Sequence, residues 1–189
     1  LEFYFAFSQE DIEDYFRLNE IILDKETSKD IFNKTLGWPY VVHLYMEAYK
    51  NKHTDADKTV LDKAYTFIEN NVWLELSDDE RQFLATMSVF SSFNLNQCMK
   101  QTFLEEKMCL KLLNSIPLIN YDEHTRRYSF NPMFDGFILQ VLDEMPVDEV
   151  TKITLRAADT NLDDGNYFEA MKLYSHSKEY RKIYQHNID

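Results

Sequence analysis

Glycine and proline are scarce in this sequence: three glycines and four prolines stand among 189 residues, whereas the two together average about 12% of a protein. Because these residues form turns and end helices, their scarcity favours long helical stretches. Hydrophobic residues make up 44% of the chain, including 14 Phe and 12 Tyr, and this composition excludes a disordered chain. We therefore expect a mainly helical protein with one or two compact cores.

The chain is acidic throughout. Asp and Glu number 33 against 20 Lys and Arg, which gives a formal net charge of −13. Affinity for nucleic acid depends on clustered Lys and Arg that release counterions from phosphates, and no stretch of the sequence has such a cluster. We expect no direct binding of nucleic acid by this chain.

Membrane contact and metal binding are also disfavoured. The longest apolar runs fall far below the ~18 residues of a membrane span. The two cysteines, Cys98 and Cys109, form no CxxC pair and have no neighbouring His or Cys at metal-ligand spacing. We expect free thiols, no metal site, no membrane contact and a cytoplasmic location.

Helix signals fill the first 76 residues. Ser8 with Asp11 is typical of a capping box at a helix start, and Ser28 is the expected start of a second helix. Gly37 fits the left-handed position after a helix, and Pro39 fits the first turn of the next. The expected helices span about 8–24, 28–37, 39–50 and 58–73. The sequence predicts a helical subdomain over residues 1–76.

A winged helix is predicted over residues 77–131. Ser77 with Glu80, and Asn94 with Gln97, are two further cap pairs. The expected helices span about 78–90, 94–103 and 104–115. Two short apolar segments, 118–121 and 127–130, flank a four-residue turn and indicate a β-hairpin. Three short helices followed by a hairpin are typical of a winged helix.

The last region, residues 132–189, is predicted to be helical again. Helices are expected over about 132–144 and 147–163. Gly165 and Tyr167 then precede Ala170, in the pattern of a tetratricopeptide-like hairpin, where glycine makes the turn and alanine lets two helices approach closely. A partner helix is expected from Ser177. We predict a linker helix and the start of a tetratricopeptide-like repeat region.

Motifs of catalysis are absent from the sequence. There is no GxxxxGK[ST] phosphate loop, no GxGxxG dinucleotide turn, no HExxH zinc helix and no GxSxG nucleophile elbow. The five histidines have no carboxylate or cysteine partner at a diagnostic spacing. We expect no catalytic residue and no enzyme activity in this chain.

Five segments follow one another in an order that is known from one family. They are Thr35-Leu36-Gly37-Trp38-Pro39 leading into 41–44, then 83–90, 112–119, 127–134 and the hairpin over 165–174. Their order and spacing resemble those of MalT-type LuxR-family transcriptional regulators, which are STAND-class signal-transducing ATPases.

The resemblance implies that the chain is a middle fragment of such a regulator. It would comprise the helical lid, the winged helix and the start of the tetratricopeptide-like sensor region of a bacterial cytoplasmic protein. ATP or ADP would be a cofactor of the parent protein, with none in the fragment. The implied partners are the neighbouring nucleotide-binding domain, the sensor solenoid and a protein or small-molecule effector.

The resemblance also implies nucleotide-contacting residues. The Gly-x-Pro of the family's lid lies against the nucleotide base and corresponds to Gly37, Trp38 and Pro39. A helix end followed by a helix start explains the same three residues without a ligand. Near the phosphates the family usually has His-His, where this chain has Asn131 and Pro132. Asn131 donates an amide hydrogen bond but carries no charge, and Pro132 has no N–H.

Two alternative functions remain open at this point. The first is a protein-interaction adaptor that never binds nucleotide. The second is a DNA-binding winged helix that would read DNA with its third helix. That helix offers Glu105 and Glu106 beside Lys107 and Lys111, and two acids among two bases make a poor reader of the major groove.

Overall fold

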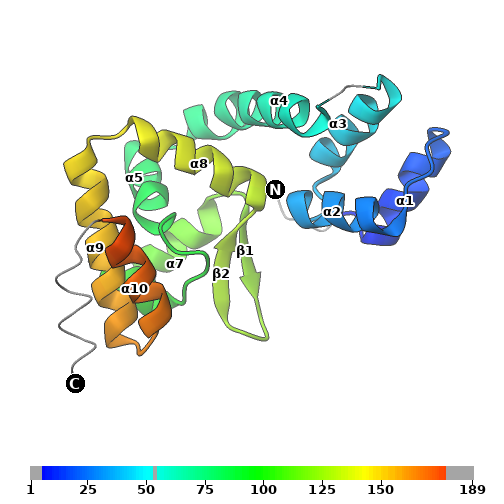
Figure 1. Ribbon diagram of the computed structural model, residues 1–189. Helices are drawn as coiled ribbons and strands as arrows, with labels where there is room; N and C mark the ends of the chain where they lie inside the picture. Colours follow the sequence, from blue (N-terminus) through cyan, green and yellow to red (C-terminus); the bar gives the residue numbers. More distant parts are fainter. Residues whose placement is uncertain (1–5, 53–54, 178–189) are drawn as a thin grey trace. The chain divides into compact units, whose positions relative to one another are not determined.

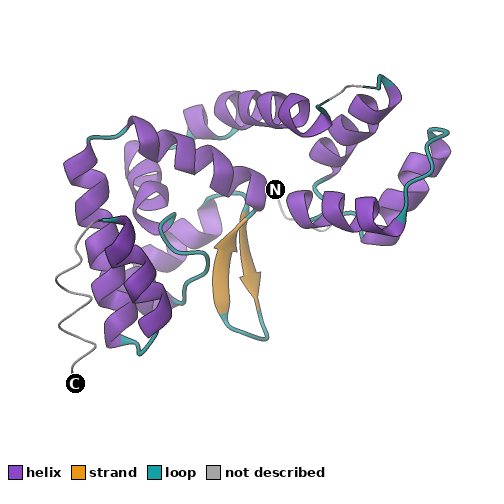
Figure 2. Cartoon of the chain, viewed as in Figure 1, coloured by secondary structure: helices purple, strands orange, loops and turns teal. Residues whose placement is uncertain are grey.

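The computed structural model describes residues 6–52 and 55–177, which are mainly helical (Figures 1 and 2). Within these residues there are ten α-helices, one short 3-10 helix and one two-stranded antiparallel sheet. The predicted fold class, mainly α with a small β-hairpin, is confirmed. None of the described helices is both long enough and apolar enough to cross a membrane.

The chain divides into two compact units. Unit 1 comprises Leu1–Leu76 and Asn131–Phe137, and unit 2 comprises Ser77–Phe130 and Ile138–Asp189. Helix α8 (Pro132–Glu144) begins in unit 1 and ends in unit 2.

Unit 1 is an assembly of helices. Its other elements are α1 (Gln9–Leu18), α2 (Lys25–Thr35), α3 (Pro39–Lys50), α4 (Ala56–Asn71) and the 3-10 helix η1 (Trp73–Glu75). Apolar side chains at helical spacing bury one face of each α-helix. The fully or almost fully buried ones include Ile12, Phe16, Ile31, Val41, Val42, Val60, Ala64 and Ile68.

Helix α1 has the predicted capping box but ends earlier than predicted. It ends at Leu18, not near residue 24. Glu20 takes a left-handed conformation with φ of 64°, and the N–H of Ile21 donates to the carbonyl of Phe16 at 3.0 Å. This is the hydrogen bond of a Schellman motif. The prediction failed because a glutamate, not a glycine, takes the left-handed position.

Helix α2 begins three residues before the predicted Ser28. Asp24 is its cap and accepts from the N–H of Thr27 at 2.7 Å. Ser28 is fully buried inside the helix, and its hydroxyl donates to Glu13 of α1 at 2.7 Å. A tertiary hydrogen bond therefore accounts for this serine. The fourth helix is likewise shifted, to Ala56–Asn71 from the predicted 58–73.

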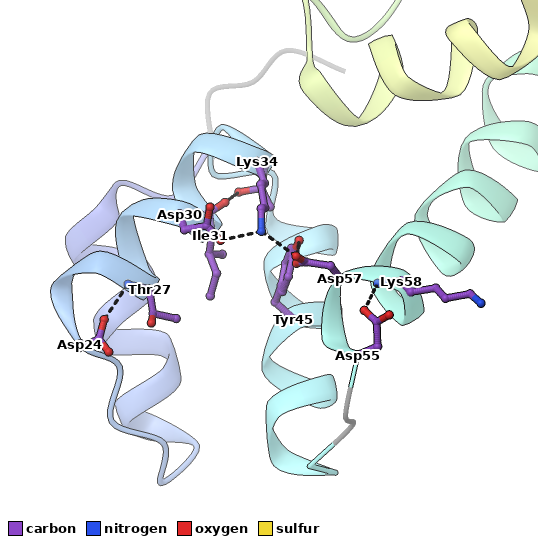
Figure 3. A network of polar contacts seen from close by, with 10 residues as sticks. Asp24, Thr27, Asp30, Ile31, Lys34, Tyr45, Asp55, Asp57 and Lys58 are labelled. Atoms are coloured by element: carbon purple, nitrogen blue, oxygen red, sulfur yellow. Dashed lines mark hydrogen bonds and ion pairs between the residues drawn. The ribbon is translucent and has the colours of Figure 1, made fainter.

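A polar network joins α2, α3 and α4 (Figure 3). The ammonium group of Lys34 lies 2.6 Å from Asp30 and 2.8 Å from Asp57. The hydroxyl of Tyr45 donates to Asp57 at 2.8 Å. Hydrogen bonding to Lys34 lowers the pKa of Asp57, so this carboxylate stays ionised and holds both partners. One aspartate of α4 thus fixes the register of two other helices.

Unit 2 contains the three predicted short helices and the hairpin. Its elements are α5 (Asp78–Met87), α6 (Leu95–Thr102), α7 (Glu106–Ser115), β1 (Ile119–Asp122), β2 (Arg127–Phe130), the end of α8, α9 (Val147–Asp163) and α10 (Tyr167–His176). The predicted cap pairs Ser77/Glu80 and Asn94/Gln97 are both confirmed as capping boxes.

The β-hairpin has an additional short pairing. Its strands run antiparallel with Ile119 opposite Phe130 and Asp122 opposite Arg127. Phe93, between α5 and α6, pairs with Tyr128 through two backbone hydrogen bonds of 2.9 and 2.7 Å. This part of unit 2 therefore consists of three short helices, a β-hairpin and one further short pairing segment.

Helices α9 and α10 form an antiparallel hairpin (Figure 1). Gly165 lies in the turn with φ of +77°, and Ala158, Ala170 and Tyr174 are fully buried between the two helices. The predicted roles of Gly165 and Ala170 are confirmed. The partner helix expected from Ser177 falls almost wholly on residues 178–189, outside the described residues.

Replacing Tyr45 by Phe should destabilise the protein by about 1 kcal/mol, because Asp57 then loses a hydrogen bond within a partly buried network. Urea unfolding at pH 7 measures this change. The loss should shrink as the pH falls below about 4, since a carboxylate with a lowered pKa stabilises the fold only above its unfolded-state pKa.

Tyr49→Phe is the matched control, because Tyr49 lies on the same helix with 39% of its surface exposed. Equal destabilisation by the two substitutions would show that the network in Figure 3 does not stabilise unit 1.

Candidate functional site

The turn between α2 and α3 contains three of the four predicted site residues. Leu36 and Gly37 both take left-handed conformations, with φ of 47° and 72°. Trp38 precedes the first turn of α3, and Pro39 opens that turn as predicted. Two consecutive left-handed residues redirect the chain without any intervening loop, so the ends of the two helices lie close together.

Gly37 is required at this turn for two reasons. Its left-handed φ is unfavourable for a residue with a Cβ. The backbone of Phe7 also crosses directly over it: the Phe7 N–H donates to the Gly37 carbonyl at 2.8 Å, and a Cβ on Gly37 would lie only 1.9 Å from the Phe7 carbonyl oxygen. No side chain fits at position 37 without displacing the segment that precedes α1.

Thr35 organises the turn through both of its oxygen atoms. Its hydroxyl donates to the Ile31 carbonyl at 2.8 Å and accepts from the Gly37 N–H at 3.0 Å. Its carbonyl accepts from the Trp38 N–H at 3.1 Å. Thr35 is fully buried, so these hydrogen bonds are shielded from water.

Asn131, the fourth predicted residue, reaches the same threonine. Its amide Nδ2 donates to the Thr35 carbonyl at 3.2 Å, across 96 residues of sequence. Its Oδ1 accepts from the Met133 N–H at 3.0 Å, and its carbonyl accepts from the Asp135 N–H at 2.8 Å. Asn131 is fully buried, and it both caps α8 and connects it to the α2–α3 turn.

Three of the four predicted residues, Gly37, Trp38 and Asn131, therefore hydrogen-bond to one buried threonine within unit 1, and Pro39 follows Trp38 at the start of α3. Thr35 itself was missed by the sequence analysis, although it was part of the Thr-Leu-Gly-Trp-Pro segment. The signal that could have found it is a β-branched hydroxyl residue at a helix end, directly before a left-handed pair.

An aromatic cluster adjoins the turn. The rings of Tyr40 and Phe67 lie 4.3 Å apart at an angle of 32°, and Trp38 lies 5.9 Å from each of them. All three are only partly buried. Tyr40 and Phe67 line a hollow of about 420 Å³ whose polar rim includes Asp62, Lys63 and Thr66. Exposed π faces beside hydrogen-bonding groups suit a planar ligand.

Asp135 has an unusual environment in the first turn of α8. Burial raises the pKa of its carboxyl group to about 6. The positive end of the helix dipole favours the ionised form at this position, but it does not offset the loss of hydration. The neighbouring Gly136 also lies close to α4, where an added Cβ would meet the Tyr65 hydroxyl at 2.3 Å.

Metal-binding and nucleophilic groups are not gathered in the described part of the chain. No three His, Cys, Asp or Glu side chains in residues 6–52 and 55–177 are placed to hold a metal ion. Cys98 and Cys109 are free and fully buried, and burial raises the pKa of the Cys98 thiol. A protonated, inaccessible thiol is a poor nucleophile.

No protein-family model matches this chain, and a search of curated proteins finds no significant match. The geometry around Thr35 is therefore the main structural guide to function.

Gly37→Ala should destabilise the protein more than Gly165→Ala. Both glycines are left-handed, which costs an alanine roughly 1 kcal/mol, but only at Gly37 does the new Cβ meet backbone, since nothing lies within 4 Å of a Cβ on Gly165. We expect a loss of about 2 kcal/mol or more for Gly37→Ala in thermal unfolding. Similar losses for the two variants would contradict the close approach of Phe7.

Asp135→Asn should stabilise the protein at pH 8 but not at pH 4. The pKa of Asp135 is raised from 3.8 to about 6 in the folded state. Its contribution to the free energy of unfolding is therefore most favourable below pH 3.8, its unfolded-state pKa, and is lost as the pH rises through 6. Removing the charge should recover about 1 kcal/mol at pH 8, allowing for partial solvent access.

Thermal unfolding at the two pH values measures this effect, with the exposed Asp143→Asn on the same helix as control. A gain of the same size at both pH values would show that ionisation of Asp135 is not the cause.

Proposed function

We propose that this chain is the regulatory middle section of a MalT-type, LuxR-family transcription regulator, a STAND-class ATPase of the bacterial cytoplasm. It has no catalytic role of its own and transmits nucleotide and effector state through the packing of domains. The parent's nucleotide-binding domain supplies ATP or ADP, and the sensor solenoid supplies effector binding. The convergence of the Gly37–Pro39 turn and Asn131 on Thr35 is the observation that carries this proposal.

The base of a nucleotide would lie at the α2–α3 turn. Trp38 presents a partly buried indole there and contacts two further rings, so a planar purine extends an existing aromatic cluster. Stacking of this kind contributes about 1–3 kcal/mol per base. The close packing of Phe7 over Gly37 keeps the turn in one conformation before the ligand arrives, which lowers the entropic cost of binding.

Asn131 is the residue that would respond to phosphate. Its Nδ2 donates to the Thr35 carbonyl, and a phosphate oxygen competes for the same donor. Transfer of that hydrogen bond separates the first turn of α8 from the α2–α3 turn, while Oδ1 continues to cap α8. Since α8 continues from unit 1 into unit 2 as one helix, the change passes along a continuous element.

The test is ADP binding by the parent protein that includes the preceding nucleotide-binding domain. Trp38→Leu should weaken ADP binding at least tenfold, as expected for the loss of one stacking partner at about 1.4 kcal/mol. Trp73→Leu is the matched control, because Trp73 lies in η1 and contacts Phe137 instead. Isothermal titration of both variants measures the difference.

The two alternative functions predict different results, one in the ADP titration and one in a DNA-binding experiment. Absence of ADP binding would contradict the proposal and favour a protein-interaction adaptor. Salt-dependent retention of the chain on duplex DNA would favour a DNA-binding winged helix. We expect no such retention, because α7 presents Glu106 beside Lys107 and Lys111.

A further inference from the structure

Arg127, the first residue of β2, is a cation without an acidic partner. Its Nε donates to the Ser92 hydroxyl at 2.9 Å, and its Nη2 donates to the Ser92 carbonyl at 2.6 Å and to Gln97 Oε1 at 3.2 Å. No described carboxylate forms an ion pair with its guanidinium group, and Nη1 has no hydrogen-bond partner among the described residues. The chain has 33 acidic residues, yet none of those described pairs with Arg127. Its charge is therefore available to bind an anionic group.

The position of this guanidinium group is fixed by its neighbours. Gln97 is fully buried, and its Oε1 accepts from both Arg127 and the Asn94 N–H. Two donors on one atom determine which end of the amide is oxygen. Its Nε2 is then a buried donor without an acceptor in the described part of the chain. Gln97 therefore holds the guanidinium group of Arg127 in place and leaves one buried donor of its own unsatisfied.

A small polar hollow of about 150 Å³ opens beside Arg127 within unit 2. Ser91 and Ser92 line it from the segment after α5, and Asn161, Asn166 and Glu169 line it from the α9–α10 hairpin. Asn161 is almost fully buried. The volume equals that of roughly five water molecules, which is enough for a ligand of five to seven non-hydrogen atoms.

The charges of the lining select the kind of ligand. Glu169 lies on the same hollow as Arg127, and its one ion pair among the described residues is with Lys172, at 3.9 Å on the surface. A simple anion such as phosphate would be attracted by Arg127 and repelled by Glu169. A small zwitterion satisfies both charges, because its two ends carry opposite charges a few ångströms apart.

We propose that this hollow binds a small α-amino acid: glycine, alanine or serine. Its carboxylate pairs with Arg127, and its ammonium group pairs with Glu169. Asn161, Asn166 and Ser91 supply the polar contacts around it. A ligand held in this way connects the winged helix to α10 inside unit 2. The inference is independent of the nucleotide contact at Gly37–Pro39.

Titration of the 189-residue chain tests the proposal. Glycine, L-alanine and L-serine should give saturable binding in calorimetry, with amide NMR shifts centred on Ser91, Ser92, Asn161 and Asn166. Acetate and methylamine each carry only one of the two charges, and they should bind at least tenfold more weakly. L-Phenylalanine should not bind, because its ring exceeds the volume of the hollow.

Two variants complete the test. Glu169→Gln keeps the shape of the side chain but removes the charge that pairs with ammonium, and it should weaken glycine binding at least tenfold. Glu144→Gln, an exposed change on α8, should leave binding unchanged. The proposal is overturned if glycine does not saturate below about 10 mM, if acetate or phosphate binds as tightly as glycine, or if Glu169→Gln has no effect.

Discussion

The carbonyl group of Thr35 shows how unit 1 is held together. The last carbonyls of a helix have no partner within that helix, and a buried carbonyl without a hydrogen bond is costly. Here the Thr35 carbonyl accepts from Trp38 of the turn and from the side chain of Asn131. The same asparagine accepts from the Met133 N–H at the start of α8. One amide therefore completes the carboxyl end of α2 and the amino end of α8.

That double role restricts which residues are able to stand at position 131. Aspartate has only acceptors at neutral pH and lysine has only donors, so neither completes both helix ends. Asparagine has both a donor and an acceptor in one side-chain amide, so it completes both helix ends.

The features predictable from sequence are those decided within a few residues. The caps at Ser77 and Asn94 and the turn at Gly165 depend on neighbours three or four positions away. The start of α2 was predicted wrongly, because Asp24 and Ser28 are both good cap residues and only the tertiary bond from Ser28 to Glu13 decides between them. The bond from Asn131 to Thr35 spans 96 residues and leaves no local pattern.

The scarcity of glycine has a structural consequence that the two units share. Six residues other than glycine take positive φ values in the described chain, against two glycines. Two of these six, Leu36 and Phe103, end α2 and α6. Shortly before each of them in the sequence, a helix carbonyl accepts a hydrogen bond from a distant side chain. Asn131 donates to the Thr35 carbonyl in unit 1, and Arg156 donates to the Gln101 carbonyl at 2.9 Å in unit 2.

The arginine also lies over the ring of Phe103, with its guanidinium carbon 4.5 Å from the ring centre. Phe103 is 76% exposed, so this contact covers one face of a side chain that otherwise faces water. Gln101 adds a hydrogen bond of 3.0 Å from its Nε2 to the Ile153 carbonyl of α9. A glycine at position 36 or 103 would have taken the left-handed conformation without strain. Leucine and phenylalanine at these positions are strained, so the two helix ends depend on tertiary contacts. The end of α2 is held by Asn131 at the start of α8, and the end of α6 is held by Arg156 of α9.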